Sequence, residues 1–579
     1  MADLAQDRST GPDAPVANDR LESWKEIATY LKRDVRTVQR WERREALPVH
    51  RQLHDKQGSV YAFRSEIEQW RAKQRKAPPL EVKGASRNWV RYTVILITGA
   101  ACVAVYLWLR KTELLVPIKT IAVLPLENLS GDPSQEYLTD GLTDEITTDL
   151  AKLGGLKVIS RTSAVQYKAT HKPIPQIARE LNVEAVVEGS YERSGDQVRV
   201  RVQLIRGATD QHLWAEEYDQ KLSDIFRLES EVAHDIAEHV ELRLTQNQQQ
   251  VLSRDHPIDP QAFQDYLQGR HYWALRTNES LHKAIEYFNL AIQRDPGDAR
   301  GYAGLAHCYL VMPFLTEMSS NEAFEKAMEA AARALALDDF SPEAHLAKAQ
   351  VLMYHDWNFR GAEQEFRRTL ALNQNYSTAH QWYGELLTFT GRHAESVREE
   401  EAALELDPLS AIVHHELASS LRDAGRYDDA VREFKKTLEI DPQLVAAHWE
   451  MAVAFQRQGK LEEAIRALKA GAEGVVKEYH FNPAMISAIN DIESAYTNTG
   501  SAGYFRQSLK FHRHLPRPSY YLARDYTQLG EKETAITELK RSYQNHDPEA
   551  LWMFIDPELE PLRGDPRFQS LVRAIGFQR

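Results

Sequence analysis

The sequence predicts a multidomain protein in which a winged helix-turn-helix, one transmembrane helix, an α/β domain and an all-α repeat solenoid follow one another. Three observations support this fold class. An apolar segment occupies residues 89–109, alternating strand patterns begin after residue 117, and one motif returns every 34 residues in the C-terminal half. The chain of 579 residues is also long enough for several domains of roughly 150 residues each.

Charge divides the chain unevenly. The formal net charge is -13, yet residues 21–76 contain 14 Lys and Arg against 8 Asp and Glu. A basic N-terminal segment favours a polyanionic partner, and the acidic remainder favours a soluble, exposed body. The first 20 residues are rich in Asp, Ala, Pro and Gly and are expected to be a disordered leader. The two cysteines, Cys102 and Cys308, are too few for a disulfide framework.

Two short helices separated by a turn are predicted in the basic segment. In SWKEIATYL, Ser23 is the expected N-cap, and Glu26 three residues later completes a capping box. Asp34 is the expected cap of the second helix. GSVYAFR then alternates apolar and polar residues as a wing strand does, and a third helix is expected in SEIEQWRAK. This order is that of a winged helix-turn-helix.

The phrases WKEIATYL, DVRTVQRWERREALP, GSVYAFR and SEIEQW resemble the winged helix-turn-helix of the MerR and excisionase families, in a domain expected at residues 21–76. The resemblance implies DNA binding, with the second helix in the major groove. The expected groove-facing residues are Arg36, Thr37, Gln39 and Arg40, the expected backbone contacts are Arg51, Lys56 and Arg64, and Arg43 and Arg44 share the exposed helix face. The alternative is that these cations only solvate a small domain or face anionic lipid.

The apolar segment WVRYTVILITGAACVAVYLWL, residues 89–109, contains one formal charge, Arg91. As a helix it would span roughly 30 Å, the thickness of a hydrocarbon core. Seven Lys or Arg residues lie near its N-terminal end, six of them between residues 71 and 88 together with Arg91, and three follow it. This bias predicts a single-pass protein of the bacterial inner membrane, with the N-terminus cytoplasmic and the C-terminal domains periplasmic. Residues 77–88 would be a linker. The alternative to a membrane span is that residues 89–109 form a buried helix in a soluble core.

Residues 118–245 change to an α/β pattern. IAVLPL, LKVIS, EAVVEGSYER, QVRVRVQLI and HLWAEEYD are predicted strands, with helices near 136–153, 174–183 and 225–240. The phrases IAVLPLENLSGDPSQEYLTDGLTDEI and ARELNVEAVVEGSYER resemble the TolB N-terminal-like or FlgO-like domain, which implies a binding module without catalytic residues. Asp140, Asp144 and Glu145 fit either a catalytic or metal cluster or, as the favoured interpretation, a solvated acidic helix face.

The region 260–579 repeats itself. Gly391, Gly425 and Gly459 are each 34 residues apart, and LELDP and LEIDP keep the same spacing. This is the period of tetratricopeptide (TPR) repeats, in which helix pairs stack and bury their faces against neighbouring pairs. About seven to eight units are expected, closed by a helix within DPELEPLRGDPRFQSLVRAIGF. The predicted structural positions of one unit are Leu417, Ala418, Gly425, Tyr427, Ala430, Phe434 and Pro442.

Histidines recur at one position of these repeats. His345, His380, His414 and His448 are 34 or 35 residues apart and are expected to be exposed. They fit a binding groove, a pH-sensitive ladder or, as the favoured interpretation, a position where the residue type matters little.

The order of these parts predicts a single-pass, one-component transcriptional regulator, similar to CadC and ToxR in layout only. Its expected partners are DNA on the cytoplasmic side, a protein or peptide on the TPR array and the lipid bilayer, with a homodimer left open. The alternative is an envelope TPR scaffold that mediates protein-protein interactions without specific DNA binding. The sequence contains no Ser-His-Asp arrangement, zinc-ligand spacing or phosphate-binding glycine loop. We therefore expect no enzymatic activity, catalytic residue, metal or cofactor.

Overall fold

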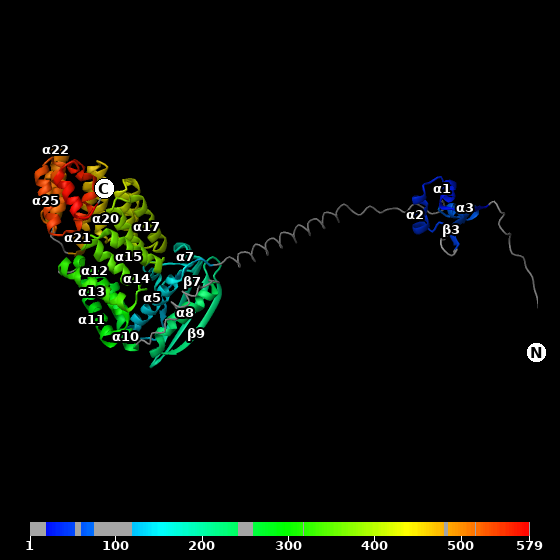
Figure 1. Ribbon diagram of the computed structural model, residues 1–579, viewed down its shortest axis with the longest axis horizontal. Helices are drawn as coiled ribbons and strands as arrows, with labels where there is room; N and C mark the ends of the chain where they lie inside the picture. The colour runs from blue at the N-terminus through cyan, green and yellow to red at the C-terminus, as the bar shows by residue number, and fades with distance from the viewer. Residues whose placement is uncertain are drawn as a thin grey trace, which may run out of the picture. The chain divides into compact units, whose positions relative to one another are not determined.

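A computed structural model describes residues 19–52, 59–74, 118–240, 259–315, 318–479, 484–515 and 517–577 (Figure 1). The chain divides into two compact units, Met1–Leu115 and Val116–Arg579, and each is described by itself. The predicted leader (apart from residues 19 and 20), the linker 77–88, the segment 89–109 and Lys56 lie outside the described residues.

The described part of the first unit contains three helices and a small antiparallel sheet. The helices are α1 (Trp24–Leu31), α2 (Val35–Glu45) and α3 (Arg64–Gln74), and the strands are β1 (Arg20–Leu21), β2 (His50–Gln52) and β3 (Ser59–Phe63), in the order β1-β3-β2. Both predicted N-caps are confirmed, because the side chains of Ser23 and Asp34 accept the backbone N–H groups of Glu26 and Thr37. The predicted capping box is not formed, because the Glu26 carboxylate accepts the N–H of Glu22 and not that of Ser23. The buried core is made of short apolar side chains from all three helices and β3, including Ile27, Leu31, Val38, Ala62 and Ile67.

The second unit begins with a six-stranded mixed sheet. Its strands are β4 (Thr120–Val123), β5 (Glu127–Asn128), β6 (Lys157–Val158), β7 (Ala185–Ser194), β8 (Gln197–Arg206) and β9 (Gln211–Lys221), in the order β6-β4-β7-β8-β9 with β5 also paired to β7. β4 runs parallel to β7, with Ile121 opposite Ala185, whereas β7, β8 and β9 are antiparallel. The predicted strands are found; β5 was not predicted, since two residues have no readable period.

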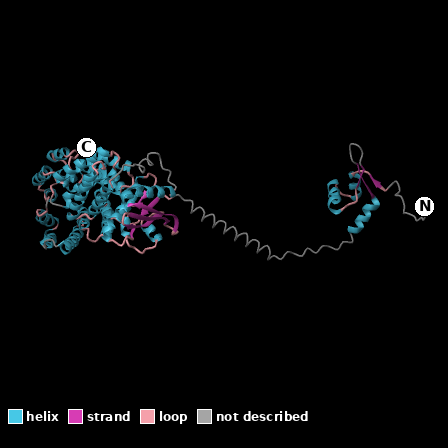
Figure 2. Cartoon of the chain, turned by 90° about the horizontal axis from the view of Figure 1, so that it is seen from below, coloured by secondary structure: helices cyan, strands magenta, loops and turns pink. Residues whose placement is uncertain are grey.

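Helices cover the two faces of this sheet. α5 (Glu136–Lys152) and α8 (Ile225–His239) share one core with the inward side chains of β4, β7 and β8, and α6 (Arg161–Ala164) and α7 (Ile174–Glu180) cover the other face. In β8 the valines 198, 200 and 202 are buried while Arg199 and Arg201 are outside, as a half-covered strand requires. Figure 2 shows the sheet beside the helices of the rest of the unit.

Among the described residues from 259 to 544, sixteen helices follow in pairs. They are α10 (Pro260–Ala274), α11 (Asn278–Arg294), α12 (Ala299–Leu315), α13 (Ser320–Leu337), α14 (Pro342–Tyr354), α15 (Phe359–Leu372), α16 (Ser377–Phe389), α17 (His393–Leu406), α18 (Ala411–Asp423), α19 (Tyr427–Ile440), α20 (Val445–Arg457), α21 (Leu461–Tyr479), α22 (Ala484–Thr499), α23 (Ser501–His512), α24 (Ser519–Gln528) and α25 (Lys532–Gln544). These eight described pairs are in line with the predicted repeat number. The even-numbered members, from α10 to α24, are called the first helices below.

The predicted positions of one unit lie at α18 and α19. Ala418, Ala430 and Phe434 are fully buried. The small alanines let the two helices approach, and the ring of Phe434 lies against His415 of α18 in the same pair. Gly425 ends α18 with φ of 78°, a backbone conformation that favours glycine. The remaining positions are Leu417, which is buried, Tyr427, which is half-buried, and Pro442, which is exposed two residues after α19 ends.

The chain ends in a segment that returns to earlier repeats. The segment 556–577, in which the closing helix was predicted, contains the 3-10 helix η5 (Pro557–Leu562) and the α-helix α26 (Pro566–Ala574). A further 3-10 helix, η4 (Pro548–Phe554), lies before it. Proline cannot donate the backbone hydrogen bond that would extend a helix through it. Residues 546–577, called the C-terminal strap, share a core with α14–α16, α24 and α25.

The predicted transmembrane helix is corrected. Within the described ranges, no helix has both the length and the apolar composition needed to cross a membrane. The two longest described helices, α13 and α21, carry Glu and Lys or Arg on several turns, and such charges are costly in hydrocarbon. The segment 89–109 itself lies outside the described residues. The fold class and the single-pass inner-membrane localisation, which both require such a helix, are therefore wrong for the described chain, which consists of a small helix-and-sheet unit, an α/β domain and a helical repeat array.

Candidate functional site

One face of α2 presents four cations to solvent. Arg36, Arg40, Arg43 and Arg44 are exposed, and none of the four side chains has a hydrogen bond or ion pair with another described residue. Arg36, Arg40 and Arg43 or Arg44 follow one another at one-turn intervals, so they lie on one side of the helix. Their positive charge is therefore available to an external anion.

The other predicted DNA-binding residues are less free. Thr37 is half-buried and its hydroxyl donates to the Asp34 carboxylate at 2.7 Å, a contact that lowers the pKa of Asp34. Arg51 on β2 forms an ion pair with Glu42 at 2.6 Å. Arg64 begins α3 with its guanidinium 5.4 Å from the centre of the Tyr30 ring. Gln39 is half-buried on α2, and Lys56 lies outside the described residues.

The turn before α2 adds two cations that were not singled out from the sequence. Lys32 and Arg33 are exposed between α1 and α2, and Lys32 adopts a left-handed conformation with φ of 53°. They lie beside the start of α2, where backbone N–H groups point outward and favour anions. The sequence feature that could have indicated Lys32 and Arg33 is the turn, which follows the last apolar residue of α1.

The acidic residues of α5 form a buried joint with the repeat array. Asp144 receives Arg161 at 2.6 Å and Arg270 of α10 at 3.2 Å, and the Tyr266 hydroxyl donates to Glu145 at 3.1 Å. Burial raises the pKa of Glu145, against the effect of the Arg270 cation. The interpretation of a solvated acidic face is thus wrong for Asp144 and Glu145, which are only 8% and 5% exposed.

A second set of contacts joins the α/β domain to the loops before α16 and α18. The Asn375 side-chain amide donates to the carbonyl oxygens of Ala151 and Leu156, at 2.8 and 2.9 Å. The Ser163 hydroxyl donates to the Asp407 carboxylate at 2.5 Å. Burial raises the pKa of Asp407 to about 6, although the hydrogen bond from Ser163 acts in the opposite direction. Asn375 and Asp407, in the loops before α16 and α18, therefore fix the α/β domain to the array.

The recurring histidines are not exposed as expected. In His345, His380 and His414, Nδ1 lies 2.6–2.7 Å from a Glu carboxylate on the second helix of the same pair. Nε2 lies 3.1–3.2 Å from a backbone carbonyl that precedes the first helix. Both partners are oxygen atoms that only accept hydrogen bonds, so each ring nitrogen of these histidines lies beside an acceptor. His448 departs from this pattern, because the position 19 residues later is Ala467 instead of Glu.

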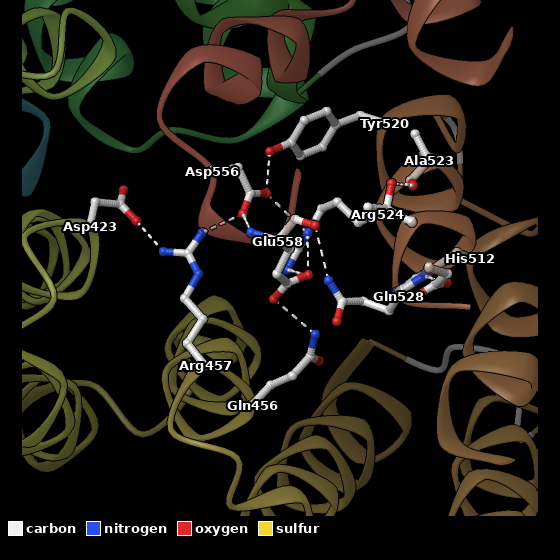
Figure 3. A network of polar contacts seen from close by, with 12 residues as sticks. Asp423, Gln456, Arg457, His512, Tyr520, Ala523, Arg524, Gln528, Asp556 and Glu558 are labelled. Atoms are coloured by element: carbon white, nitrogen blue, oxygen red, sulfur yellow. Dashed lines mark hydrogen bonds and ion pairs between the residues drawn. The ribbon is translucent and has the colours of Figure 1, made fainter. Parts of the chain in front are cut away.

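A buried network of charges joins α18, α20 and α24 to the strap (Figure 3). Arg457 pairs with Asp423 at 2.6 Å and with Asp556 of the strap at 3.3 Å. Arg524 pairs with Asp556 at 3.2 Å and with Glu558 at 2.8 Å. The side chains of Arg457 and Asp556 are only 5% and 1% exposed. Each buried charge therefore has at least one opposite charge beside it, which is the condition for burying it.

The pKa of Asp423 reflects this environment. Burial alone would raise it, but the guanidinium groups of Arg422 and Arg457 hold the pKa of Asp423 well below its usual range. The network consists of ion pairs and hydrogen bonds between buried side chains of the helices and of the strap. Within the described part of the chain, no group of three or more His, Cys, Asp or Glu side chains is placed to hold a metal ion.

Two solved structures are similar to parts of the chain. One is the "Crystal structure of YrrB: a TPR protein with an unusual peptide-binding site", with 19% identity, 34% of this chain and 95% of that chain covered, and a TM-score of 0.25. Another is the "Crystal structure of PilW, widely conserved type IV pilus biogenesis factor", with 20% identity, 38% and 94% covered, and a TM-score of 0.31.

Two named relatives match parts of the chain. A protein of Rhizobium meliloti (strain 1021) named "Putative adenylate cyclase 3" is 34% identical over 244 residues, which are 41% of this chain and 40% of the relative. "Transcriptional regulator HilA" of Salmonella typhimurium is 27% identical over 146 residues, or 25% of this chain and 26% of the relative. The chain thus spans less than half the length of either relative.

Two family models match the second unit. Residues 118–236 match the family described as HilA/YgeH-like transcriptional regulator, second domain, at the place where the sequence predicted a TolB N-terminal-like or FlgO-like domain. Residues 421–480 match the tetratricopeptide repeat, which confirms the predicted repeat type. Neither family is an enzyme type. Residues 118–236 are therefore similar to the second domain of HilA/YgeH-like transcriptional regulators, and a TPR array follows them.

Proposed function

We propose that this protein is a transcriptional regulator that binds DNA through a winged helix-turn-helix formed by its first unit and docks a partner protein on its TPR array. The observation that carries the proposal is the row of four arginines on α2 without carboxylate partners in the described chain. The regulator family matched by residues 118–236 supports the same interpretation, as does the resemblance of the first unit to MerR and excisionase domains.

The expected roles follow from side-chain chemistry. Arg36 and Arg40 are placed on the exposed face where a guanidinium can donate two hydrogen bonds to a guanine edge, and Gln39 can pair with adenine. Arg43 and Arg44, one turn further on, suit phosphate contacts, which release counterions and make binding salt-dependent. Thr37 and Arg51 must exchange their contacts with Asp34 and Glu42 before they bind DNA. Lys56 and Arg64 complete the predicted backbone contacts.

The test is genome-wide DNA capture with the full chain and with an Arg36→Ala/Arg40→Ala variant. We expect the full chain to enrich a small set of fragments that share one sequence, and the variant to lose that enrichment. Arg71→Ala is the matched control, because Arg71 lies on α3 and pairs with Glu68 at 2.8 Å. Equal capture by the chain and the double variant would remove α2 as the recognition helix. Loss of capture in the control as well would point to nonspecific charge.

Pairing of two chains would strengthen such binding. Two linked heads on a symmetric site add effective concentration without new contacts. Analytical ultracentrifugation with and without the captured DNA fragment tests this part of the proposal. A 1:1 complex on a non-symmetric site would exclude the homodimer.

A further inference from the structure

The C-terminal strap lies across the ends of several first helices that are far from it in sequence. The ring of Trp552 meets the ring of Phe389, at the end of α16, edge to face with centroids 4.9 Å apart. Asp556 pairs with Arg457 at the end of α20, and Gln456 donates to Glu558 at 2.9 Å. The strap therefore fills a surface made by the first helices of separate repeats.

The acidic side chains of the strap are matched by arginines of this surface. Glu549 receives Arg517 at 3.1 Å. Both carboxylate partners of Arg524, Asp556 and Glu558, are on the strap. Three carboxylates in ten residues thus meet the guanidinium groups of Arg457, Arg517 and Arg524, in the arrangement shown in part in Figure 3. Bidentate or paired guanidinium contacts of this kind are specific for carboxylates.

The strap is held as a peptide is held in a groove. Between Pro548 and Leu562 it forms only the 3-10 helices η4 and η5, so this stretch has no α-helical face to pack. Its contacts are aromatic and acidic side chains and the fully buried Leu551, Met553, Leu559 and Leu562. The Gln528 amide also donates to the Glu558 carbonyl oxygen at 2.9 Å. Proline at 548, 557 and 561 lowers the entropy that such a segment loses on docking.

We propose that this surface, formed by Phe389, Gln456, Arg457, Arg517 and Arg524, is the docking site for a segment of a partner protein that carries aromatic residues followed by paired carboxylates. The strap is a ligand of the same chemistry in the same chain, and the partner competes with it. This inference deepens the proposed function, since it rests on the TPR array as the partner-docking part and states what that partner presents.

The probe is a fluorescent synthetic peptide with the sequence of residues 549–562, EALWMFIDPELEPL. Its anisotropy is measured with the full chain and with a full-length variant, Trp552→Ala/Asp556→Ala, whose strap lacks one of its aromatic and one of its acidic side chains. We expect the variant to bind the peptide about tenfold more tightly, because an occupied surface reduces the apparent affinity by the fraction that is free. A peptide with its Glu549, Asp556 and Glu558 changed to Lys should not bind.

Two further variants separate docking from loss of structure. Trp552→Ala alone leaves the buried charges in place, so it gives a second, milder opening of the strap if the double variant unfolds. Arg517→Ala added to the Trp552→Ala/Asp556→Ala chain, called the opened chain, should weaken peptide binding about fivefold. Arg517 is partly exposed, and an exposed ion pair is worth up to about 1 kcal/mol. Circular dichroism reports whether each chain keeps its helices.

Three results would overturn the inference. The opened chain could be folded and bind no peptide, or bind the acidic and the Lys peptides equally. It could also form a dimer that the peptide does not dissociate, in which case the surface serves a second copy of the chain. The assay contains no DNA, so these failures are distinguishable from failure of the recognition helix in the capture experiment.

Discussion

Arginine is used in opposite ways in the two compact units. On α2, Arg36, Arg40, Arg43 and Arg44 are exposed and lack ion-pair partners among the described residues. In the repeat array, Arg457 is only 5% exposed and is held between two carboxylates. The same side chain is therefore a free donor in one unit and a fixed structural cation in the other.

This difference between exposed and buried arginines predicts which mutations should change DNA binding and which should change the stability of the fold. An exposed arginine without a partner costs little to remove from the folded chain, but a ligand that it contacts loses affinity. A buried paired arginine leaves uncompensated carboxylates behind. The following changes break or sharpen this contrast.

Arg457→Ala should have the largest effect on stability. It leaves Asp423 and Asp556 buried with one arginine each, Arg422 and Arg524. Breaking a buried pair lowers the free energy of unfolding by about 3–5 kcal/mol. Because each carboxylate keeps one arginine, we expect a loss of about 3 kcal/mol, at the lower end of this range. Differential scanning calorimetry of the full chain measures it as a lower Tm of the array transition. Arg426→Ala is the control, because its pair with Asp429 is on the surface, and an equal loss in both would contradict the contrast.

Arg40→Ala should leave the Tm unchanged and weaken binding to the captured DNA fragment by about 1–3 kcal/mol. Arg51→Ala should have a smaller effect, since Arg51 is already paired with Glu42 and is a predicted phosphate ligand. Anisotropy titrations at several salt concentrations measure both the affinity and the salt slope, which should fall by about one for each arginine removed from a phosphate. Equal losses of affinity at both positions would show that the pair with Glu42 does not matter.

Asp407→Asn should stabilise the joint between the α/β domain and the array at neutral pH. The folded pKa of Asp407 is about 6, above its usual 3.8. Its contribution to stability is therefore present below about pH 4 and is lost as the pH rises to about 6. The neutral amide removes this loss, so the Tm at pH 7 should rise by about 2–4 °C and remain unchanged near pH 4. Asn373 already occupies the equivalent position one repeat earlier. Asp441→Asn is the control outside the joint.

His345→Gln should have the smallest effect on the Tm, and the size of this effect should depend on pH. Burial lowers the pKa of His345, but the hydrogen bonds with Glu365 and the Asp339 carbonyl together raise it by more. The folded pKa therefore lies above the usual value. Glu365 also pairs with Lys348 at 2.7 Å. The stabilisation by protonated His345 is present below about pH 6.5 and is lost as the pH rises through the folded pKa. His345→Gln should therefore reduce the change in Tm between about pH 6 and pH 8 by no more than about 2 °C.

His448→Gln is the comparison for this prediction. Burial lowers the pKa of His448, so its contribution is present at higher pH and is lost as the pH falls through the folded value. The two variants should therefore shift the pH dependence of the Tm in opposite directions. Shifts of the same sign would show that the Glu partner does not determine the charge of these histidines.

The local parts of the fold could be predicted from the sequence. The caps at Ser23 and Asp34 depend on side chains and N–H groups three residues apart, and the glycine turns recur at a fixed period. Alternation in β8 indicated both the strand and its buried face. The exposed arginines of α2 were also predicted, because they lie opposite the apolar residue Val38.

Contacts between distant residues could not be predicted in the same way. The acidic residues of α5 were assigned to solvent, because nothing near them in sequence indicates that Arg270 and Tyr266 cover them. The partners of the recurring histidines are 19 or 20 residues away on another helix. The strap pairs with residues about 100 positions earlier, as in Gln456 and Glu558, and no local period encodes such a pair.

The strap also determines the order in which the array is completed during synthesis. Units that include Phe389 and Arg457 leave the ribosome before Trp552 and Asp556 have been translated. Non-local contacts of this kind form late in folding, after the loop between them is closed. A nascent chain therefore displays an unoccupied aromatic and cationic surface for a short time, in which a chaperone or an early-arriving partner meets no competitor.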